Sequence, residues 1–141
     1  MAEATQAKTE ELVWPSFYPS NVPPNESTDA SGVFYRLVRV NPPSDQCFQS
    51  THEEQPHRHK KLKGDALQNV FGASFYSDKN RAIDTRDKFP EALGDRLLAE
   101  GDLQPYMGKM KQTFKPFHFT VWLKVGCNIS RCFSCIEGDS K

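Results

Sequence analysis

The chain has 141 residues, of which 37% are hydrophobic, and its 18 Lys and Arg residues balance 18 Asp and Glu residues. This length suits one domain with a core of its own. The zero formal charge gives no support for nucleic acid or an anionic membrane as partner, and no apolar run approaches the ~20 residues of a membrane span. The first residues, MAEATQAKTEEL, lack the apolar segment of a secretory signal, so we expect a cytoplasmic location with reduced cysteines.

Residues 1–31 form a proline-rich segment that we expect to be an irregular arm. The stretch WPSFYPSNVPPNESTDAS contains too many prolines for a helix or a central strand. Trp14, Phe17 and Tyr18 either attach the arm to the domain surface or bind a partner protein. The first interpretation is favoured, because aromatic side chains are costly to leave in water.

The next elements alternate between strands and polar segments. Residues 33–40 (VFYRLVRV) predict a strand that is apolar on both faces and therefore covered on both, and Asn41-Pro42-Pro43 ends it. The polar residues 49–66 show no periodicity and predict a surface loop. Residues 72–77 predict a second strand, and Ser77-Asp78 caps a helix that runs to about residue 88, before Pro90.

Two further strands are predicted, over residues 94–103 and 114–125. In the second of these, FKPFHFTVWLKV, apolar residues alternate with a face that carries His118, Thr120 and Trp122. The sum is an α+β domain at residues 32–126, with a small, mainly antiparallel sheet and one or two short helices. Residues 127–141 then form a cysteine-containing tail.

Arg36 lies near the centre of an otherwise apolar strand, where a guanidinium is expensive unless it is paired. Either it reaches the sheet edge or an acidic residue such as Asp95, or it lines a cleft and holds a phosphate or carboxylate. His118 is either a satisfied histidine on a sheet face or a group that positions or protonates a ligand. Ser74 is either a small residue in a tight strand or a ligand-binding hydroxyl.

Three pieces, FYRLV followed by NPP, GASFYS before a short helix, and HFTVW, together resemble a set of small bacterial proteins with the ADP-ribosyltransferase fold. This group includes RES-type NAD-degrading toxins, and the resemblance covers residues 33–125. It implies a split sheet and an enzyme or effector that acts on NAD or a related nucleotide. The family has an arginine or histidine on the first strand that holds NAD, which matches Arg36, and a serine on the second strand, which matches Ser74.

The resemblance thus implies that Arg36 holds the pyrophosphate, Ser74 the nicotinamide ribose and His118 a ribose hydroxyl or the leaving group. Tyr35, Thr120 and Trp122 would complete the cofactor site, with stacking on the two rings. The family also has a later glutamate that activates the ribose, and here the sequence departs from the pattern. The last strand offers His118 and Thr120 instead, and Glu100 substitutes only if LLAEG is the third element.

A different class of function needs no active site: a non-enzymatic protein-binding domain, such as an inhibitor or immunity-type factor. This alternative accounts for the absent glutamate, the neutral charge and the aromatic arm.

The spacing Cys127-x4-Cys132-x2-Cys135 could supply three zinc ligands, with Cys47 or a histidine as the fourth. One Cys-x2-Cys pair is weak support for zinc, so no metal site is predicted, and His52, His57 and His59 are placed in a solvated loop.

Overall fold

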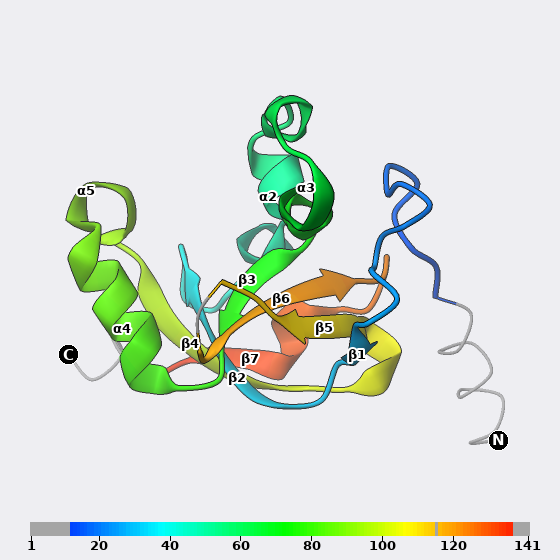
Figure 1. Cartoon of the computed structure of the whole chain (residues 1–141). Coiled ribbons are helices and arrows are strands. Elements are labelled where there is room, and N and C mark those ends of the chain that lie inside the picture. The colour runs from blue at the N-terminus through cyan, green and yellow to red at the C-terminus, as the bar shows by residue number, and fades with distance from the viewer. Residues whose placement is uncertain (1–11, 115, 137–141) are drawn as a thin grey trace, which may run out of the picture.

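Seven strands form one antiparallel sheet in the described part of the chain, which is residues 12–114 and 116–136 of a computed structural model (Figure 1). The strands are β1 Thr28–Asp29, β2 Gly32–Val38, β3 Ala73–Tyr76, β4 Leu97–Leu103, β5 Gly108–Gln112, β6 His118–Leu123 and β7 Phe133–Cys135. The α-helices are α2 Thr51–Glu54, α3 Gly64–Val70, α4 Lys79–Lys88 and α5 Pro90–Leu93, and short 3-10 turns are η1 Asp45–Phe48, η2 Arg58–Lys61, η3 Pro105–Met107 and η4 Ile129–Cys132. The predicted α+β class with an antiparallel sheet is confirmed, although the helices outnumber the one or two expected.

The strand order is β1-β5-β6-β3-β2-β4-β7, and its pairing is uneven at the centre. β2 pairs with β4 along its whole length, from Gly32↔Leu103 to Val38↔Leu97. β2 and β3 share only the register pair Tyr35↔Tyr76. Beyond this pair the two strands separate, and the sheet is split between β2 and β3.

Several predicted elements agree closely with the structure, because their ends carry clear signals. The helix expected from Ser77-Asp78 is α4, and the carboxylate of Asp78 accepts a hydrogen bond of 2.8 Å from the backbone N–H of Asn80. Ala82 on this helix is fully buried against the sheet. The strand predicted at residues 94–103 is β4.

The loop predicted for residues 49–66 is wrong, because this stretch contains α2, η2 and the start of α3. Ser50 and Glu53 form a capping box at the first of these, in which each side chain bonds to the other residue's backbone N–H. The long strand predicted at residues 114–125 is also wrong in its first part. Phe114 and Phe117 have positive φ angles of 66° and 69°, which belong to the turn between β5 and β6.

Both predicted flanking segments contribute to the domain where they are described. In the arm, β1 pairs with β5, and Val22 is buried against Trp122 together with the half-buried Trp14 and Tyr18. Toward the C-terminus, β7 pairs with β4, so residues 133–135 are an edge strand and not part of a separate tail. Residues 1–11 and 137–141 lie outside the described part.

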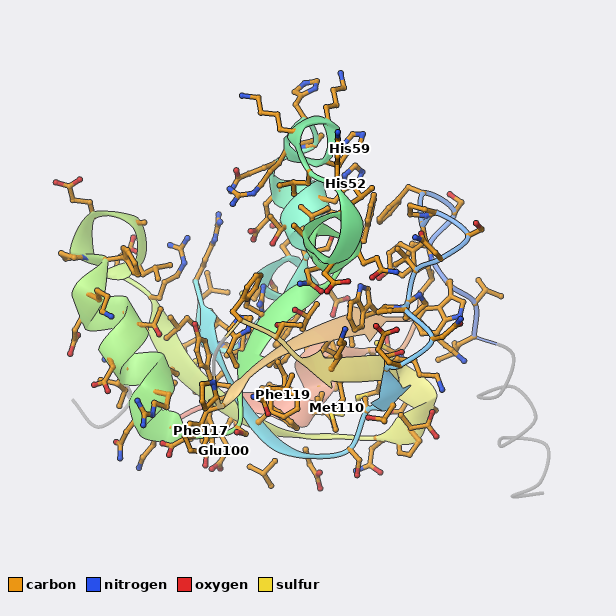
Figure 2. All side chains as sticks on the ribbon, viewed as in Figure 1. His52, His59, Glu100, Met110, Phe117 and Phe119 are labelled. Carbon is orange, nitrogen blue, oxygen red and sulfur yellow. The ribbon has the colours of Figure 1, made fainter. Side chains whose placement is uncertain are left out.

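Apolar side chains are buried on both faces of the sheet. The larger core is on the face that carries Phe34, Val38 and Phe75, and Met110 and Phe119, labelled in Figure 2, pack against its margin. On the opposite face, α4 covers Tyr76 and Leu98, while α3 and the arm cover Trp122. Since these two coverings lie on either side of it, the split between β2 and β3 opens between two helix-covered regions.

No helix in the described residues is both long enough and apolar enough to cross a membrane.

Candidate functional site

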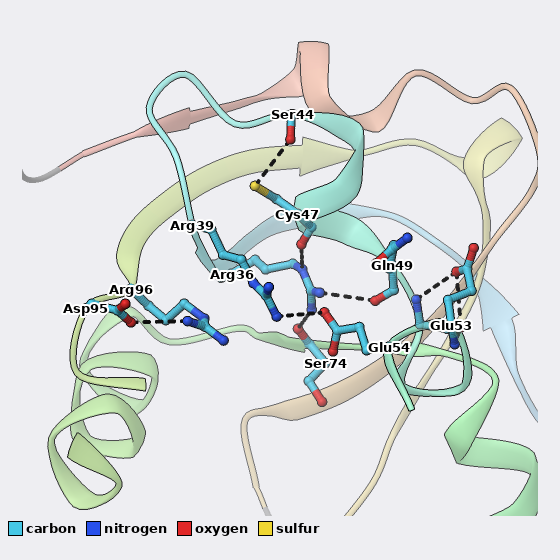
Figure 3. A network of polar contacts seen from close by, with 11 residues as sticks. Arg36, Arg39, Ser44, Cys47, Gln49, Glu53, Glu54, Ser74, Asp95 and Arg96 are labelled. Atoms are coloured by element: carbon cyan, nitrogen blue, oxygen red, sulfur yellow. Dashed lines mark hydrogen bonds and ion pairs between the residues drawn. The ribbon is translucent and has the colours of Figure 1, made fainter. Parts of the chain in front are cut away.

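A pocket of about 200 Å³ lies at the split of the sheet and is lined by charged side chains. Three arginines, Arg36, Arg39 and Arg96, contribute to its wall, and Glu54 is the single carboxylate of the described lining. Figure 3 shows the three guanidinium groups and Glu54 directed toward the same space. We call this site the arginine pocket. Guanidinium groups outnumber carboxylates in its wall, so it favours an anionic ligand.

Arg36 forms the floor of the arginine pocket and is 8% exposed. Its Nε donates to the carbonyl of Cys47 at 2.7 Å, its Nη1 to that of Ser74 at 2.7 Å, and its Nη2 to that of Gln49 at 3.2 Å (Figure 3). Its guanidinium carbon also lies 5.3 Å from the ring centre of Phe75. Where β2 and β3 separate, these three bonds take the place of the hydrogen bonds that would join two paired strands. The partners of Arg36 are therefore backbone carbonyls, and not an acidic residue such as Asp95.

Burial is the main influence on the charge of Arg36. It lowers the pKa of Arg36 to about 10, and the nearby Glu54 is the largest influence that opposes this shift. The side chain therefore remains a cation at neutral pH. A guanidinium has more N–H groups than the three hydrogen bonds use, so Arg36 can still donate to a ligand.

Arg39 and Arg96 form the outer wall and are held more loosely. Arg39 is 58% exposed at its side chain, and its Nη2 lies 3.6 Å from the carboxylate of Glu54. Arg96 donates to the exposed carboxylate of Asp95 at 3.1 Å. Exposed ion pairs of this kind are weak, so an incoming anion can replace them.

Arg36 lies on one face of the sheet, whereas Ser74 and His118 lie on the other. Side chains alternate along a strand, and the pair Tyr35↔Tyr76 places Ser74 and Tyr76 on the face opposite Arg36. Ser74 still lines the arginine pocket, because the split lets the Arg36 guanidinium reach its carbonyl from the other face. The structure therefore brings Arg36 and Ser74 together and leaves His118 apart.

His118 and Thr120 belong to a buried hydrogen-bond network around Thr113. The hydroxyl of Thr113 lies 3.0 Å from Nδ1 of His118 and 2.8 Å from the hydroxyl of Thr120. The ring of His118 packs edge-on against Tyr76, with ring centres 5.2 Å apart. His118 is only 5% exposed and does not line the arginine pocket. The interpretation of His118 as a satisfied histidine on a sheet face agrees with this arrangement.

The two rings expected to stack on a cofactor lie elsewhere. Trp122 is fully buried and its indole N–H donates to the carbonyl of Gln68 at 3.0 Å, so it has no exposed surface for a ligand. Tyr35 is half-buried, and a hydrogen bond with Glu100 raises the pKa of its hydroxyl. Neither Tyr35 nor Glu100 lines the arginine pocket. They face each other across the sheet, Tyr35 on β2 and Glu100 on β4, at the register pair Tyr35↔Glu100.

Arg39, Glu54 and Arg96 are the charged pocket residues that were not predicted from the sequence. Arg39 stands two residues before Asn41, which begins Asn41-Pro42-Pro43, and it directly follows the end of β2, a common place for binding residues. Glu54 follows the capping box that marks α2. Arg96 carries no such signal, because only the pairing of β4 with β2 brings it to the pocket.

All four cysteines are free thiols, and no described group of three His, Cys, Asp or Glu residues is placed to hold a metal ion. Cys127 and Cys135 are buried among apolar side chains of the larger core. Burial raises the pKa of the Cys127 thiol, which disfavours its thiolate form.

His52, in the stretch predicted as a loop, lies beside the arm. The ring of His52 is 4.7 Å from that of Phe71, 5.1 Å from that of Phe17 and 5.0 Å from that of His59. Its buried Nδ1 has no hydrogen-bond partner among the described residues. Burial, with His59 in addition, lowers the pKa of His52, whereas Glu53 opposes the shift.

This shift predicts a pH-dependent stability. Since the pKa of His52 is lower in the folded chain, the unfolded chain binds more protons once the pH falls below the ordinary histidine value of about 6.5. The contribution of neutral His52 to the stability of the folded chain is therefore complete at pH values above the ordinary histidine pKa and is lost at lower pH. Melting temperatures measured from about pH 7.5 to about pH 5 should therefore fall less for His52→Phe than for the native chain. His57→Gln, at an exposed position, serves as the control, and equal slopes for all three proteins would contradict the prediction.

The assignment of the arginine pocket depends on its own geometry. No protein-family model, curated protein or solved structure matches the chain.

Proposed function

We propose that the arginine pocket binds the phosphate groups of NAD or a related nucleotide, and that the chain acts on this ligand. The observation that carries the proposal is the convergence of Arg36, Arg39 and Arg96 on one pocket whose lining includes a single carboxylate. Planar guanidinium groups bind phosphate oxygens in pairs, which makes arginine the usual residue for this task. The resemblance of FYRLV and GASFYS to NAD-acting proteins supports NAD over other anions.

The size of the pocket limits which part of the ligand it holds. Pockets that enclose a whole drug-sized ligand measure about 300–1,000 Å³, whereas the arginine pocket has about 200 Å³. A diphosphate or a ribose phosphate fits this space, and the bases would lie along the outer surface. Ser74, which is exposed on the pocket wall, remains the proposed contact to a ribose hydroxyl.

Glu54 has two proposed roles in the pocket. In the unliganded chain it pairs with Arg39, so a phosphate would have to replace its carboxylate there. Release of nicotinamide from NAD passes through an oxocarbenium-like ribose, and a nearby carboxylate would stabilise this positive charge. Glu54 is the carboxylate of the described lining, and we assign this role to it, although it precedes Ser74 in the chain whereas the family glutamate comes later. His118 is buried and is left out of the proposed site.

Arg39→Gln and Arg96→Gln should each weaken the binding of ADP-ribose about tenfold, since a hydrogen bond to a charged group contributes about 1.5–3 kcal/mol. Isothermal titration calorimetry with ADP-ribose and NAD measures this effect. Arg131→Gln, at an exposed position of η4, is the matched control and should bind as the native chain does. Adenosine, which has no phosphate, should bind weakly to all four proteins.

The catalytic part of the proposal has its own measurement. Purified protein incubated with NAD should release nicotinamide, and Glu54→Gln should abolish the release while ADP-ribose still binds. If ADP-ribose does not bind the native chain, the proposed function is wrong. If it binds but no nicotinamide appears, the site is a binding site without this reaction.

A further inference from the structure

A second concentration of positive charge lies at the tip of the protrusion formed by α2, η2 and α3. Residues 57–63, with the sequence HRHKKLK, include no acidic residue. Arg58, Lys60, Lys61 and Lys63 are all exposed. Figure 1 shows α2 and α3 rising away from the sheet, and Figure 2 shows side chains that end in nitrogen spreading above His59. We call residues 57–63 the basic tip.

The four cations of the basic tip have no ion-pair partner among the described residues, whereas several cations elsewhere do. Arg58 donates to the side chain of Gln55 at 3.5 Å. By contrast, Lys109 pairs with Asp29 at 2.9 Å and Lys111 with Glu26 at 3.1 Å. The zero net charge of the chain therefore conceals a strongly positive end, which would attract a polyanion.

The shape of the basic tip distinguishes between polyanions. An anionic membrane is disfavoured, because no large apolar side chain of residues 55–63 is exposed and Leu62 packs into the core around Trp122. A nucleic-acid duplex is disfavoured too, since α2 and η2 have four residues each and are too short to follow a groove. A shallow hollow within the basic tip is lined by Pro56, His57 and Leu62 together with Arg58 and Lys61.

We infer that the basic tip binds single-stranded nucleic acid. Its cations would contact successive phosphates, and the flat side chains of Pro56 and His57 in the hollow would offer a surface for an unpaired base. Binding of this kind depends on charge and stacking and not on sequence. The inference is independent of the arginine pocket, because none of the residues of the basic tip line that pocket.

Fluorescence anisotropy of a labelled oligouridylate measures the binding directly. With four phosphates neutralised, the logarithm of the affinity should fall with the logarithm of the salt concentration with a slope of about −3. The double variant Lys60→Glu/Lys61→Glu should bind at least about tenfold more weakly at about 50 mM salt. The control double variant Lys79→Glu/Lys88→Glu changes the net charge equally at exposed positions of α4 and should lose less than about twofold.

Three outcomes would overturn the inference. They are absence of binding at low salt, equal losses in the two double variants, and tighter binding to phosphatidylserine vesicles or to a duplex of the same length than to the single strand. Urea unfolding of each variant confirms that it is folded. ADP-ribose binding should be unchanged in Lys60→Glu/Lys61→Glu, so a failure here is separable from a failure of the arginine pocket.

Discussion

The Arg36→Met variant is expected to unfold with about 3 kcal/mol less free energy than the native chain, since each buried carbonyl that loses its donor costs about 1–3 kcal/mol. Three carbonyls, those of Cys47, Gln49 and Ser74, lose their donor together. Only the bond to Cys47 is fully buried, and methionine removes the cost of burying a charge. The expected loss of unfolding free energy is therefore smaller than the full cost of three unpaired buried carbonyls. Urea unfolding followed by circular dichroism measures the loss.

Two further substitutions separate the geometry of Arg36 from its charge. Arg36→Lys keeps the cation but cannot reach three carbonyls with one ammonium group, so we expect it to recover only part of the lost stability. Arg39→Met removes an exposed cation from the same pocket and should cost less than about 0.5 kcal/mol. If Arg36→Met and Arg39→Met lose the same small amount, Arg36 does not hold β3 and the segment around η1 in place.

Trp122→Ala is expected to lose about 3–5 kcal/mol, the usual cost of removing a large aromatic side chain from a core. Trp122 is fully buried and joins three parts of the chain: β6, on which it lies, α3, through the bond to Gln68, and the arm, through Val22. Its removal should therefore loosen the arm as well as the core. Urea unfolding measures the stability.

The chain has two tryptophans, so the fluorescence of Trp14 alone reports on the arm in Trp122→Ala. Its emission should shift to longer wavelength as Trp14 becomes exposed to water. Trp122→Phe keeps an aromatic ring but loses the N–H donor, and it should cost only about 1–2 kcal/mol. An unfolding curve for Trp122→Ala close to that of the native chain would show that the arm and α3 do not depend on this residue.

The elements that the sequence predicted correctly carry their signals locally. Asp78 caps α4 and Pro90 follows its end, so both limits of the helix could be read from residue types. The capping box of Ser50 and Glu53 was equally readable and would have indicated α2. β5 was missed because GKMKQ is short and largely polar, so it does not show the alternation of apolar and polar residues that marks a half-buried strand.

The arginine pocket could be predicted only in part. Arg36 was singled out because a charge in an apolar strand requires compensation, but its partners are backbone carbonyls, which every residue possesses and which leave no trace in the sequence. His118 was misplaced because the face that it shares with Thr120 and Trp122 is also buried, although its polar residues suggested a ligand-facing surface. Arg39 and Arg96 meet only through the pairing of β2 with β4.

The position of β7 has a consequence for any form of the chain in which this strand is detached. One edge of β4 pairs with β2, and its other edge is covered by β7, residues 133–135. When β7 is detached, the N–H and C=O groups along that edge of β4 have no partner strand. Unpaired edges of this kind are the sites at which strands of different molecules join. Gly101 leaves the space that Phe133 fills, so the docking of β7 closes an edge that another molecule could otherwise extend.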